Sequence, residues 1–153
     1  MRAVVGRRAA ALVAVTVIVG VVAWVSRSPG RLTVDDPGAT ASTATACGRF
    51  DDALPHQLGA LDRRGTNVDR VGVAAYGEPA VVVLCGAPLS GRFRPTDPLL
   101  AINDIPWFAE ERPDIIVFSL PRSIINVEVR IPREYPAELL SLLTDAVRQA
   151  QPL

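Results

Sequence analysis

The sequence contains no lysine, one histidine and two cysteines, and neither charge sign dominates, with 16 basic and 16 acidic residues. Balanced charge argues against nucleic-acid binding, which depends on clustered positive charge. A zinc site built on the two cysteines needs two more ligands, and the chain offers one histidine. The cysteines do not form the C-x-x-C spacing of a redox motif. The exclusive use of arginine is typical of G+C-rich coding and indicates an actinobacterial source.

Motifs of nucleophilic hydrolysis and phosphate binding are also missing. No G-x-S-x-G or S-x-x-K occurs in the soluble part, and no glycine-rich loop opens a helix after a strand. His56 follows a proline in a short surface helix expected over residues 53–61, where a lone histidine is ordinarily structural or solvated. Asp51 and Asp52 are interpreted as capping residues of that helix rather than a catalytic carboxylate pair. We therefore expect no enzyme activity, no cofactor, and no catalytic, cofactor-binding or metal-binding residue.

An uncharged apolar run covers residues 9–25, after the N-terminal arginines Arg2, Arg7 and Arg8. As a helix it would be roughly 25 Å long, close to the thickness of a hydrocarbon core of about 30 Å. Trp24 lies at its outer end, where an indole prefers the membrane interface. The run is longer than a usual signal-peptide core, and no A-x-A-like cleavage site follows it closely. The pattern predicts an uncleaved signal anchor with its N-terminus inside the cell.

These features divide the chain into four parts. Residues 1–8 form a cytoplasmic N-terminus and residues 9–25 a single transmembrane anchor. Residues 26–46 are rich in Ser, Thr, Ala, Gly and Pro without periodicity, which predicts a flexible, disordered linker. Residues 47–153 form an extracytoplasmic domain that is long enough for one modest core. The predicted location is therefore the cell membrane.

Both cysteines fall in the part predicted to lie outside the membrane. Two thiols in an oxidising compartment ordinarily pair, so we expect a disulfide between Cys47 and Cys85. In the chain-entropy model that bond stabilises the fold by roughly 4 kcal/mol. One alternative stays open, because ATAC at residues 44–47 resembles a lipobox and a lipidated Cys47 could not pair with Cys85. Against it, residues 26–46 separate this cysteine from the apolar run.

The domain sequence alternates between strand and helix patterns. Residues 81–84 are apolar at every position, as in a strand buried on both faces, and residues 99–103 predict another short strand. Residues 114–120 and the alternating residues 123–131 predict an antiparallel hairpin with one solvated face. Residues 136–150 begin with proline and predict an amphipathic helix. Its apolar stripe consists of Leu139, Leu142, Leu143, Ala146, Val147 and Ala150. The sum is an α+β fold, a small antiparallel sheet with helices packed on one face.

Three stretches of the domain resemble a known family. They are AYGEPAVVVLCG at residues 75–86, INDIPWFAEE at 102–111, and INVEVRIP at 125–132 followed by a helix. Over residues 47–150 the chain is similar to the actinobacterial membrane or envelope family catalogued as domain of unknown function 3515. The resemblance implies an N-terminal apolar segment and a cysteine after a strand, and it implies no activity, cofactor or catalytic residue.

Two classes of function remain open. The first, which we favour, is a non-enzymatic accessory module, anchored through residues 9–25, that contacts an envelope protein or a wall component. The second is a small-ligand or hydrolytic domain with its site in the irregular loops. For the first class the candidate contact residues are Trp107, Phe108, Arg92 and Arg94, because Trp and Arg are enriched at binding hot spots. This hypothesis requires an exposed Trp107, whereas the lone tryptophan of a domain ordinarily fills the core.

Overall fold

A computed structural model describes residues 30–39, 41–121 and 123–151. The chain separates into two compact units, Met1–Gly30 and Arg31–Leu153, and the second of these is the folded domain. The predicted anchor at residues 9–25 and its flank at residues 1–8 lie outside the described residues. Within the described ranges, no helix combines the length and hydropathy that a bilayer crossing requires.

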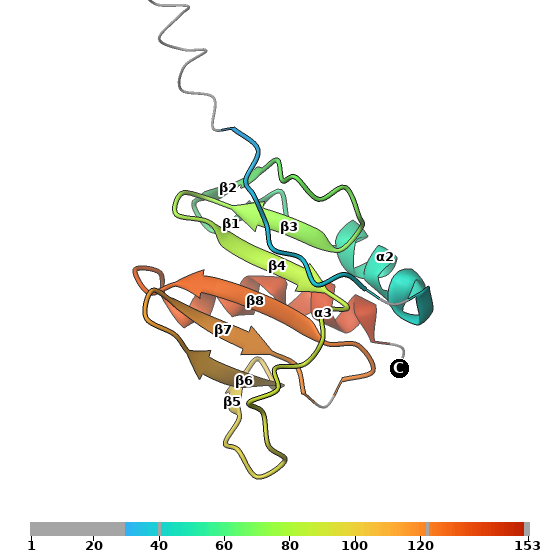
Figure 1. Ribbon diagram of the computed structural model, residues 1–153, viewed down its shortest axis with the longest axis vertical. Coiled ribbons are helices and arrows are strands. Elements are labelled where there is room, and N and C mark those ends of the chain that lie inside the picture. Colours follow the sequence, from blue (N-terminus) through green and yellow to red (C-terminus); the bar gives the residue numbers. More distant parts are fainter. Residues whose placement is uncertain (1–29, 40, 122, 152–153) are drawn as a thin grey trace, which may run out of the picture. The chain divides into compact units, whose positions relative to one another are not determined.

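One eight-stranded antiparallel sheet forms the centre of the domain, in the order β1-β2-β3-β4-β8-β7-β6-β5 (Figure 1). Its first half is a meander of β1 (Gln57–Leu58), β2 (Leu61–Arg64), β3 (Val73–Tyr76) and β4 (Val81–Cys85). Its second half is a meander of β5 (Leu100–Ile102), β6 (Ile105–Glu111), β7 (Ile115–Ser119) and β8 (Val127–Pro132). The two halves are joined in the middle, where β4 pairs with β8 from Val82 opposite Arg130 to Cys85 opposite Val127.

The helical segments come before and after the strands. η1 (Ala41–Thr43) and α2 (Ala44–Asp52) precede the sheet, and η2 (Ala137–Leu143) and α3 (Thr144–Ala150) follow it. Figure 1 shows α2 and α3 together on one face of the sheet. The predicted α+β class, an antiparallel sheet with helices on one face, is therefore confirmed for this domain.

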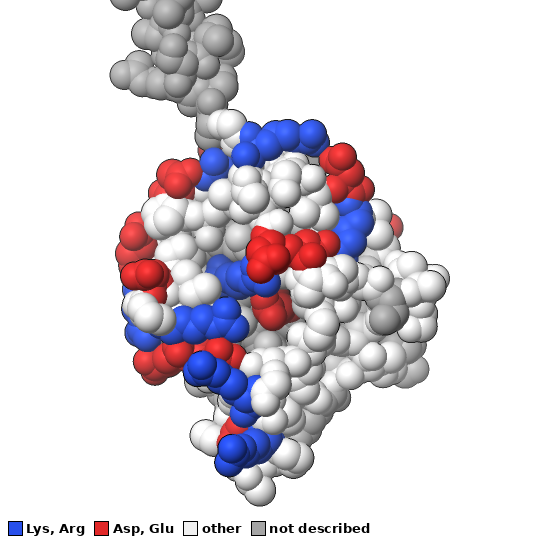
Figure 2. All heavy atoms as spheres, in the orientation of Figure 1, with Lys and Arg blue, Asp and Glu red and all other residues white. Residues whose placement is uncertain are grey.

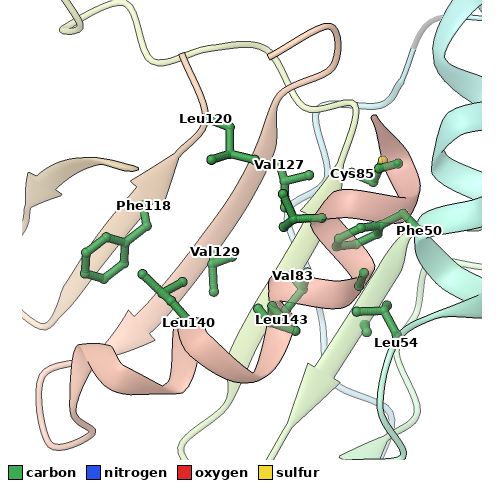
Figure 3. Packing of buried hydrophobic residues seen from close by; sticks show 14 of the residues in the cluster. Phe50, Leu54, Val83, Cys85, Phe118, Leu120, Val127, Val129, Leu140 and Leu143 are labelled. Atoms are coloured by element: carbon green, nitrogen blue, oxygen red, sulfur yellow. The ribbon is translucent and has the colours of Figure 1, made fainter. Parts of the chain in front are cut away.

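The main hydrophobic core fills the space between this helical layer and the sheet (Figure 3). The helical layer contributes Phe50 from α2, Leu54 from the turn just after α2, and Leu140 and Leu143 from η2, all buried. The strands contribute Val83, Phe118, Val127 and Val129, which are also buried. Removing a side chain of this size from water stabilises the fold by about 1.5–3 kcal/mol, before the entropy of ordering it is subtracted.

The opposite face of the sheet is covered in part by residues 31–39, which we call the strap (Figure 1). The strap N–H of Leu32 donates to the Gly65 carbonyl at 2.9 Å, and the Asn67 N–H donates back to the Leu32 carbonyl at 3.0 Å. Val34 is buried in a second cluster of apolar residues, which includes Val73, Val82, Leu84 and Ala87. The linker predicted over residues 26–46 is therefore wrong for residues 31–39, which form the strap, and for residues 41–46, which are helical. The domain begins at Arg31, before the predicted boundary at Cys47.

The strap also changes the environment of β8. The alternating pattern of residues 123–131 predicted a solvated face that includes Glu128 and Arg130. Instead Glu128 is only 8% exposed, and Arg130 donates to the Asp35 carbonyl of the strap at 2.9 Å. The hairpin itself is confirmed, with Ile116 opposite Ile131.

The short helix predicted over residues 53–61 is wrong. The helix lies earlier, in α2, because Cys47 and Phe50 are three residues apart and both face the core. Pro55 cannot continue a helix, and the chain turns into the β1–β2 hairpin. Asp51 and Asp52 therefore end a helix rather than cap its start.

The C-terminal helix was predicted correctly in place and incorrectly in its first turns. η2 is a 3-10 helix with three residues per turn, so Leu140 and Leu143 share the buried side. Leu142, assigned to the buried stripe by a period of 3.6, is about half exposed. The stripe resumes as predicted in α3, where Ala146, Val147 and Ala150 are buried.

Candidate functional site

The predicted contact patch is not formed, because Trp107 is 0% exposed. It lies on β6, opposite Leu100 of β5, and points into the main core. Phe108, the next residue of the strand, is also buried and points to the other face. In the sequence, Pro106 and Pro113 indicate a loop or an edge strand for the segment between them, but β6 tolerates Pro106. β5 and β6 form a hairpin with two turn residues, in which Ala101 and Pro106 are opposite each other and exchange no backbone hydrogen bonds. On its other side, β6 pairs with β7 only from Phe108 onward, so neither neighbouring strand needs an N–H from Pro106.

Arg92 and Arg94 lie apart from Trp107, in the exposed loop of residues 86–99 that connects β4 to β5. Phe93, between the two arginines, packs edge-on against Phe108 with ring centroids 5.3 Å apart and fixes the loop to the sheet. The Arg94 N–H donates to the carboxylate of Asp97 at 2.8 Å. Figure 2 shows acidic and arginine side chains interspersed over this face of the domain. The arginines therefore do not form a surface with the core tryptophan.

Glu110 is a buried carboxylate beneath the same loop. Its oxygens accept hydrogen bonds from the Ser90 hydroxyl at 2.5 Å and from Arg112 Nε at 2.9 Å. Burial acts to raise the pKa of Glu110, but the bonds from Ser90 and Arg112 outweigh it, so its pKa lies below the ordinary range. A carboxylate with a lowered pKa is a weaker base. The Ser90 and Glu110 pair is therefore poorly suited to activate a serine nucleophile, and it holds the loop on β6.

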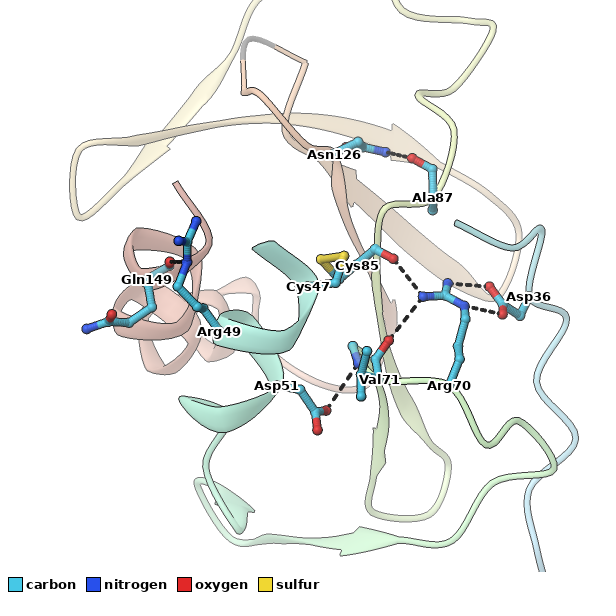
Figure 4. The surroundings of a disulfide bond; sticks show 11 residues. Asp36, Cys47, Arg49, Asp51, Arg70, Val71, Cys85, Ala87, Asn126 and Gln149 are labelled. Atoms are coloured by element: carbon cyan, nitrogen blue, oxygen red, sulfur yellow. Dashed lines mark hydrogen bonds and ion pairs between the residues drawn. A yellow bond between two sulfur atoms is a disulfide. The ribbon is translucent and has the colours of Figure 1, made fainter. Parts of the chain in front are cut away.

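The disulfide predicted between Cys47 and Cys85 is present, with the two Cα atoms 5.6 Å apart (Figure 4). It joins α2 to the end of β4, and both cysteines are fully buried in the main core. The alternative of a lipid on Cys47 is inconsistent with this structure, because its sulfur is already bonded. Gly72 lies against the bond, with φ of +79°, and a Cβ there would lie 2.7 Å from the Cβ of Cys85.

Arg70 and Asp36 connect the strap to the disulfide region (Figure 4). Arg70 donates to both carboxylate oxygens of Asp36 at 2.6 Å and to the Cys85 carbonyl at 2.9 Å. The hydrogen bond from Arg70 is the main reason that the pKa of Asp36 lies below its ordinary value. Sequence reasoning missed this pair, because Asp36 fell in the part read as a linker.

The backbone of His56 and the side chain of Asp51 bond to residues of β2 and of the chain before β3. His56 is exposed in a bend, and its carbonyl accepts the Arg63 N–H at 3.1 Å. Asp51 accepts the Gly72 N–H at 3.3 Å and forms an ion pair with Arg63 at 3.2 Å. In the part of the chain that the structure describes, no group of three or more His, Cys, Asp or Glu side chains is placed to hold a metal ion.

A groove of about 360 Å³ lies between β5 and η2. It is lined by Leu100, Ala101, Ile102, Asn103, Ala137, Glu138 and Ser141. The groove follows from the 3-10 geometry of η2, which directs every third residue toward β5 while Leu140 and Leu143 face the core. Leu100 remains 45% exposed at its edge. We call this feature the β5–η2 groove.

The turn between β5 and β6 holds one end of this groove in place. Asn103 and Asp104 have φ values of 49° and 64°, which are typical of a two-residue type I′ hairpin turn. The Asn103 amide donates to the Thr144 hydroxyl at 3.0 Å, and Arg148 donates to the Asn103 carbonyl at 3.3 Å. The hairpin is thus tied to the start and the middle of α3. The Asn-Asp pair between two isoleucines is the sequence signal that could have predicted the turn. No pattern in the sequence indicated the groove.

A family model described as "Protein of unknown function (DUF3515)" matches residues 8–153. No curated protein and no solved structure is similar enough to this chain to count as a match. The matched range covers every strand and helix of the domain, together with the three stretches that carried the resemblance in the sequence. The chain therefore belongs to the DUF3515 family.

Proposed function

We propose that this protein is a membrane-anchored, extracytoplasmic module of the cell envelope that binds a partner and catalyses no reaction. The observation that carries the proposal is the buried disulfide between Cys47 and Cys85. Disulfides persist in oxidising compartments and are rare where thiols are kept reduced. The uncharged run at residues 9–25, preceded by three arginines, supplies the anchor in this proposal.

The side chains that could act in catalysis are engaged in contacts that hold the fold, which supports binding rather than catalysis as the role of the domain. Ser90 and Glu110 hold the 86–99 loop, and Asp51 holds the chain before β3. Each is thus engaged in a contact that maintains the fold. The β5–η2 groove offers an apolar surface beside polar groups, which is the usual composition of a binding site.

Location can be tested on the full chain in its native host. A phosphatase that is active only after oxidative folding, fused after residue 153, is expected to be active, and the fusion to be recovered with membranes. Ile18→Arg places a charge in the middle of the apolar run and should release the protein from membranes, because a central arginine opposes insertion by about 2.5–3.5 kcal/mol. Ser28→Arg, outside the run, is the matched control. An inactive fusion, free thiols at Cys47 and Cys85 in cells, or a mature N-terminus within residues 26–46 would contradict the proposal.

Binding can be tested with a photo-crosslinking amino acid in place of Leu100 at the groove. The matched control position is Ile124, which is 71% exposed in the loop between β7 and β8. We expect a crosslinked species of defined mass from Leu100 and none from Ile124, with mass spectrometry identifying an envelope protein or wall fragment. Equal crosslinking from both positions, or from neither, would argue against a partner at the groove.

A further inference from the structure

We infer that the β5–η2 groove binds an extended polypeptide segment of the partner, which adds a strand to β5 and carries an apolar residue beside an arginine or lysine. This inference rests on the proposed binding function and specifies its site and the chemistry of the partner. It follows from the open edge of β5, the shape of the groove and the charge around it.

β5 is the last strand of the sheet and pairs only with β6 in the part of the chain that the structure describes. In a hairpin closed by two turn residues, Ile102 and Ile105 form a hydrogen-bonded pair, and the next pair along is not hydrogen-bonded. The N–H and C=O of Ala101 therefore point away from β6. They present one donor and one acceptor at the open edge, which is the arrangement that a peptide uses when it adds to a sheet.

The groove lies where such an added strand would place its side chains. Leu100 and Ile102 are opposite Trp107 and Ile105, so they face the helical side of the sheet, where the groove opens. Alternate side chains of the added strand would point to the same side. A volume of about 360 Å³, with Ala137 on the far wall, accommodates one large apolar side chain.

Charge around the groove favours a basic segment. Glu138 lines the groove, and the exposed Asp104 follows the lining residue Asn103. Neither carboxylate belongs to an ion pair among the described residues. Arg148 donates to the neutral Asn103 carbonyl and forms no ion pair with either carboxylate among the described residues. A positive side chain next to the apolar residue would therefore meet carboxylates that have no cationic partner in the described domain.

The same charges disfavour a second copy of this chain as the occupant. Pairing of β5 with the β5 of another copy would be isologous, so each surface would meet an identical one. In antiparallel pairing about Ala101, η2 of both copies, each with its Glu138, would lie on the same face of the joined sheet, and like charges there oppose such a contact. The edge is also short, at three residues, which limits the hydrogen bonds that self-pairing could form.

The test uses the full chain in detergent and a phage-displayed library of random heptapeptides. We expect enriched peptides to contain an apolar residue next to Arg or Lys and to lack proline at the positions that pair with Ala101. Their affinity is expected in the micromolar range, because β5 offers one outward-facing residue. Glu138→Arg should weaken binding by about tenfold, as the charge contact is lost and reversed, and Ala101→Pro should weaken it by at least tenfold, as the outward donor is removed.

Matched variants keep the test informative. Leu100→Asp should abolish binding, whereas Ile124→Asp, an equivalent change at an exposed site away from the groove, should leave it unchanged. Thermal unfolding of each variant confirms that the domain is folded, and Glu138→Arg replaces Ala101→Pro as the deciding variant if the proline prevents folding. The inference is overturned if no peptide family is enriched, or if the enriched peptides bind the Glu138 and Leu100 variants as tightly as the original chain. It is also overturned if the chain forms a dimer through β5 that Leu100→Asp dissolves.

The two proposals fail separately. A phosphatase fusion that is active at the membrane together with an absence of peptide binding removes only the strand-addition inference. An inactive fusion contradicts the proposed location, whether or not the peptides bind.

Discussion

The ion pair between Asp36 and Arg70 is expected to hold the strap on the domain, and its loss can be measured. The two side chains are 9% and 23% exposed, and Arg70 contacts both oxygens of the carboxylate at 2.6 Å. Removing one partner of a fully buried pair costs about 3–5 kcal/mol. Because Arg70 is partly solvated, we expect Arg70→Met to lower the free energy of unfolding by about 2–3 kcal/mol. For a domain of this size that corresponds to a fall in Tm of roughly 10 °C.

The assay is urea unfolding of the full chain in detergent, followed by circular dichroism. Asp36→Asn keeps part of the hydrogen bonding and should cost about 1 kcal/mol. The double variant should cost little more than Arg70→Met alone, because the second substitution removes a contact that is already lost. The control is Arg31→Met. Its ion pair with Asp69 joins side chains that are 68% and 81% exposed, so the loss should stay below about 0.5 kcal/mol.

The pair also predicts a direction for the dependence of stability on pH. The pKa of Asp36 is lower in the folded state than in the unfolded chain, whose ordinary value is about 3.9. The stabilisation is therefore complete above that value and is lost as the pH falls through the folded pKa. Asp36→Asn should reduce this loss below about pH 4.

Two results would refute the reasoning. One is additive effects of Asp36→Asn and Arg70→Met, which would mean that the two side chains do not act as a pair. The other is a strap that exchanges its amide hydrogens at the same rate in Arg70→Met as in the original chain. The informative amide is that of Val34, which donates to the Asn67 side chain at 2.7 Å.

Three further predictions follow from buried groups. Trp107→Ala should destabilise the domain by about 3–5 kcal/mol in thermal unfolding, because it leaves a large cavity in the core. The control, Arg94→Ala, should change stability by less than about 0.5 kcal/mol. Equal effects of the two substitutions would contradict the core position of Trp107. Replacing Cys47 and Cys85 by alanine should cost about 4 kcal/mol in the chain-entropy model, measured by urea unfolding, and an unchanged midpoint would show that the bond is absent from the folded protein. Glu110→Gln should lower the free energy of unfolding by about 1 kcal/mol at neutral pH and by less at acid pH. The pKa of Glu110 is lowered in the fold, so its carboxylate stabilises the fold only while it is ionised. A loss of stability that does not depend on pH in denaturant titrations would contradict this assignment.

The sequence predicted correctly those strands whose pattern of apolar residues follows from local structure alone. The run at residues 81–84 is β4, buried throughout, and the hairpin of residues 114–131 is β7 and β8. The disulfide could also be predicted, because two thiols in an oxidising compartment have few alternatives.

The errors arose where a distant segment overrides a local pattern. Residues 31–39 have the composition of a linker, and their contacts with distant residues, among them Arg70 and the second cluster of apolar residues, make them ordered. Pro106 beside Trp107 indicates a loop or an edge strand, yet it occupies a position where β6 needs no donor. Leu142 was assigned by an α-helical period in a segment that is a 3-10 helix.

The β5–η2 groove had no signal in the sequence, because its walls come from segments that are more than thirty residues apart. Its lining is ordinary in composition, and only the open edge of the sheet and the three-residue period of η2 bring it together.

The disulfide between Cys47 and Cys85 also determines how the domain would resist a pulling force applied at Arg31. Such a force would first peel the strap from the sheet and would then reach Cys47. There the covalent bond transfers the load directly to Cys85, so residues 48–84, which include β1, β2 and β3, carry no tension. The bypassed part also includes residues 81–84 of β4, which pairs with both β3 and β8, so the first half of the sheet stays joined to the second. Reduction of the bond would expose the first half of the sheet to unzipping from its edge, at a much lower force.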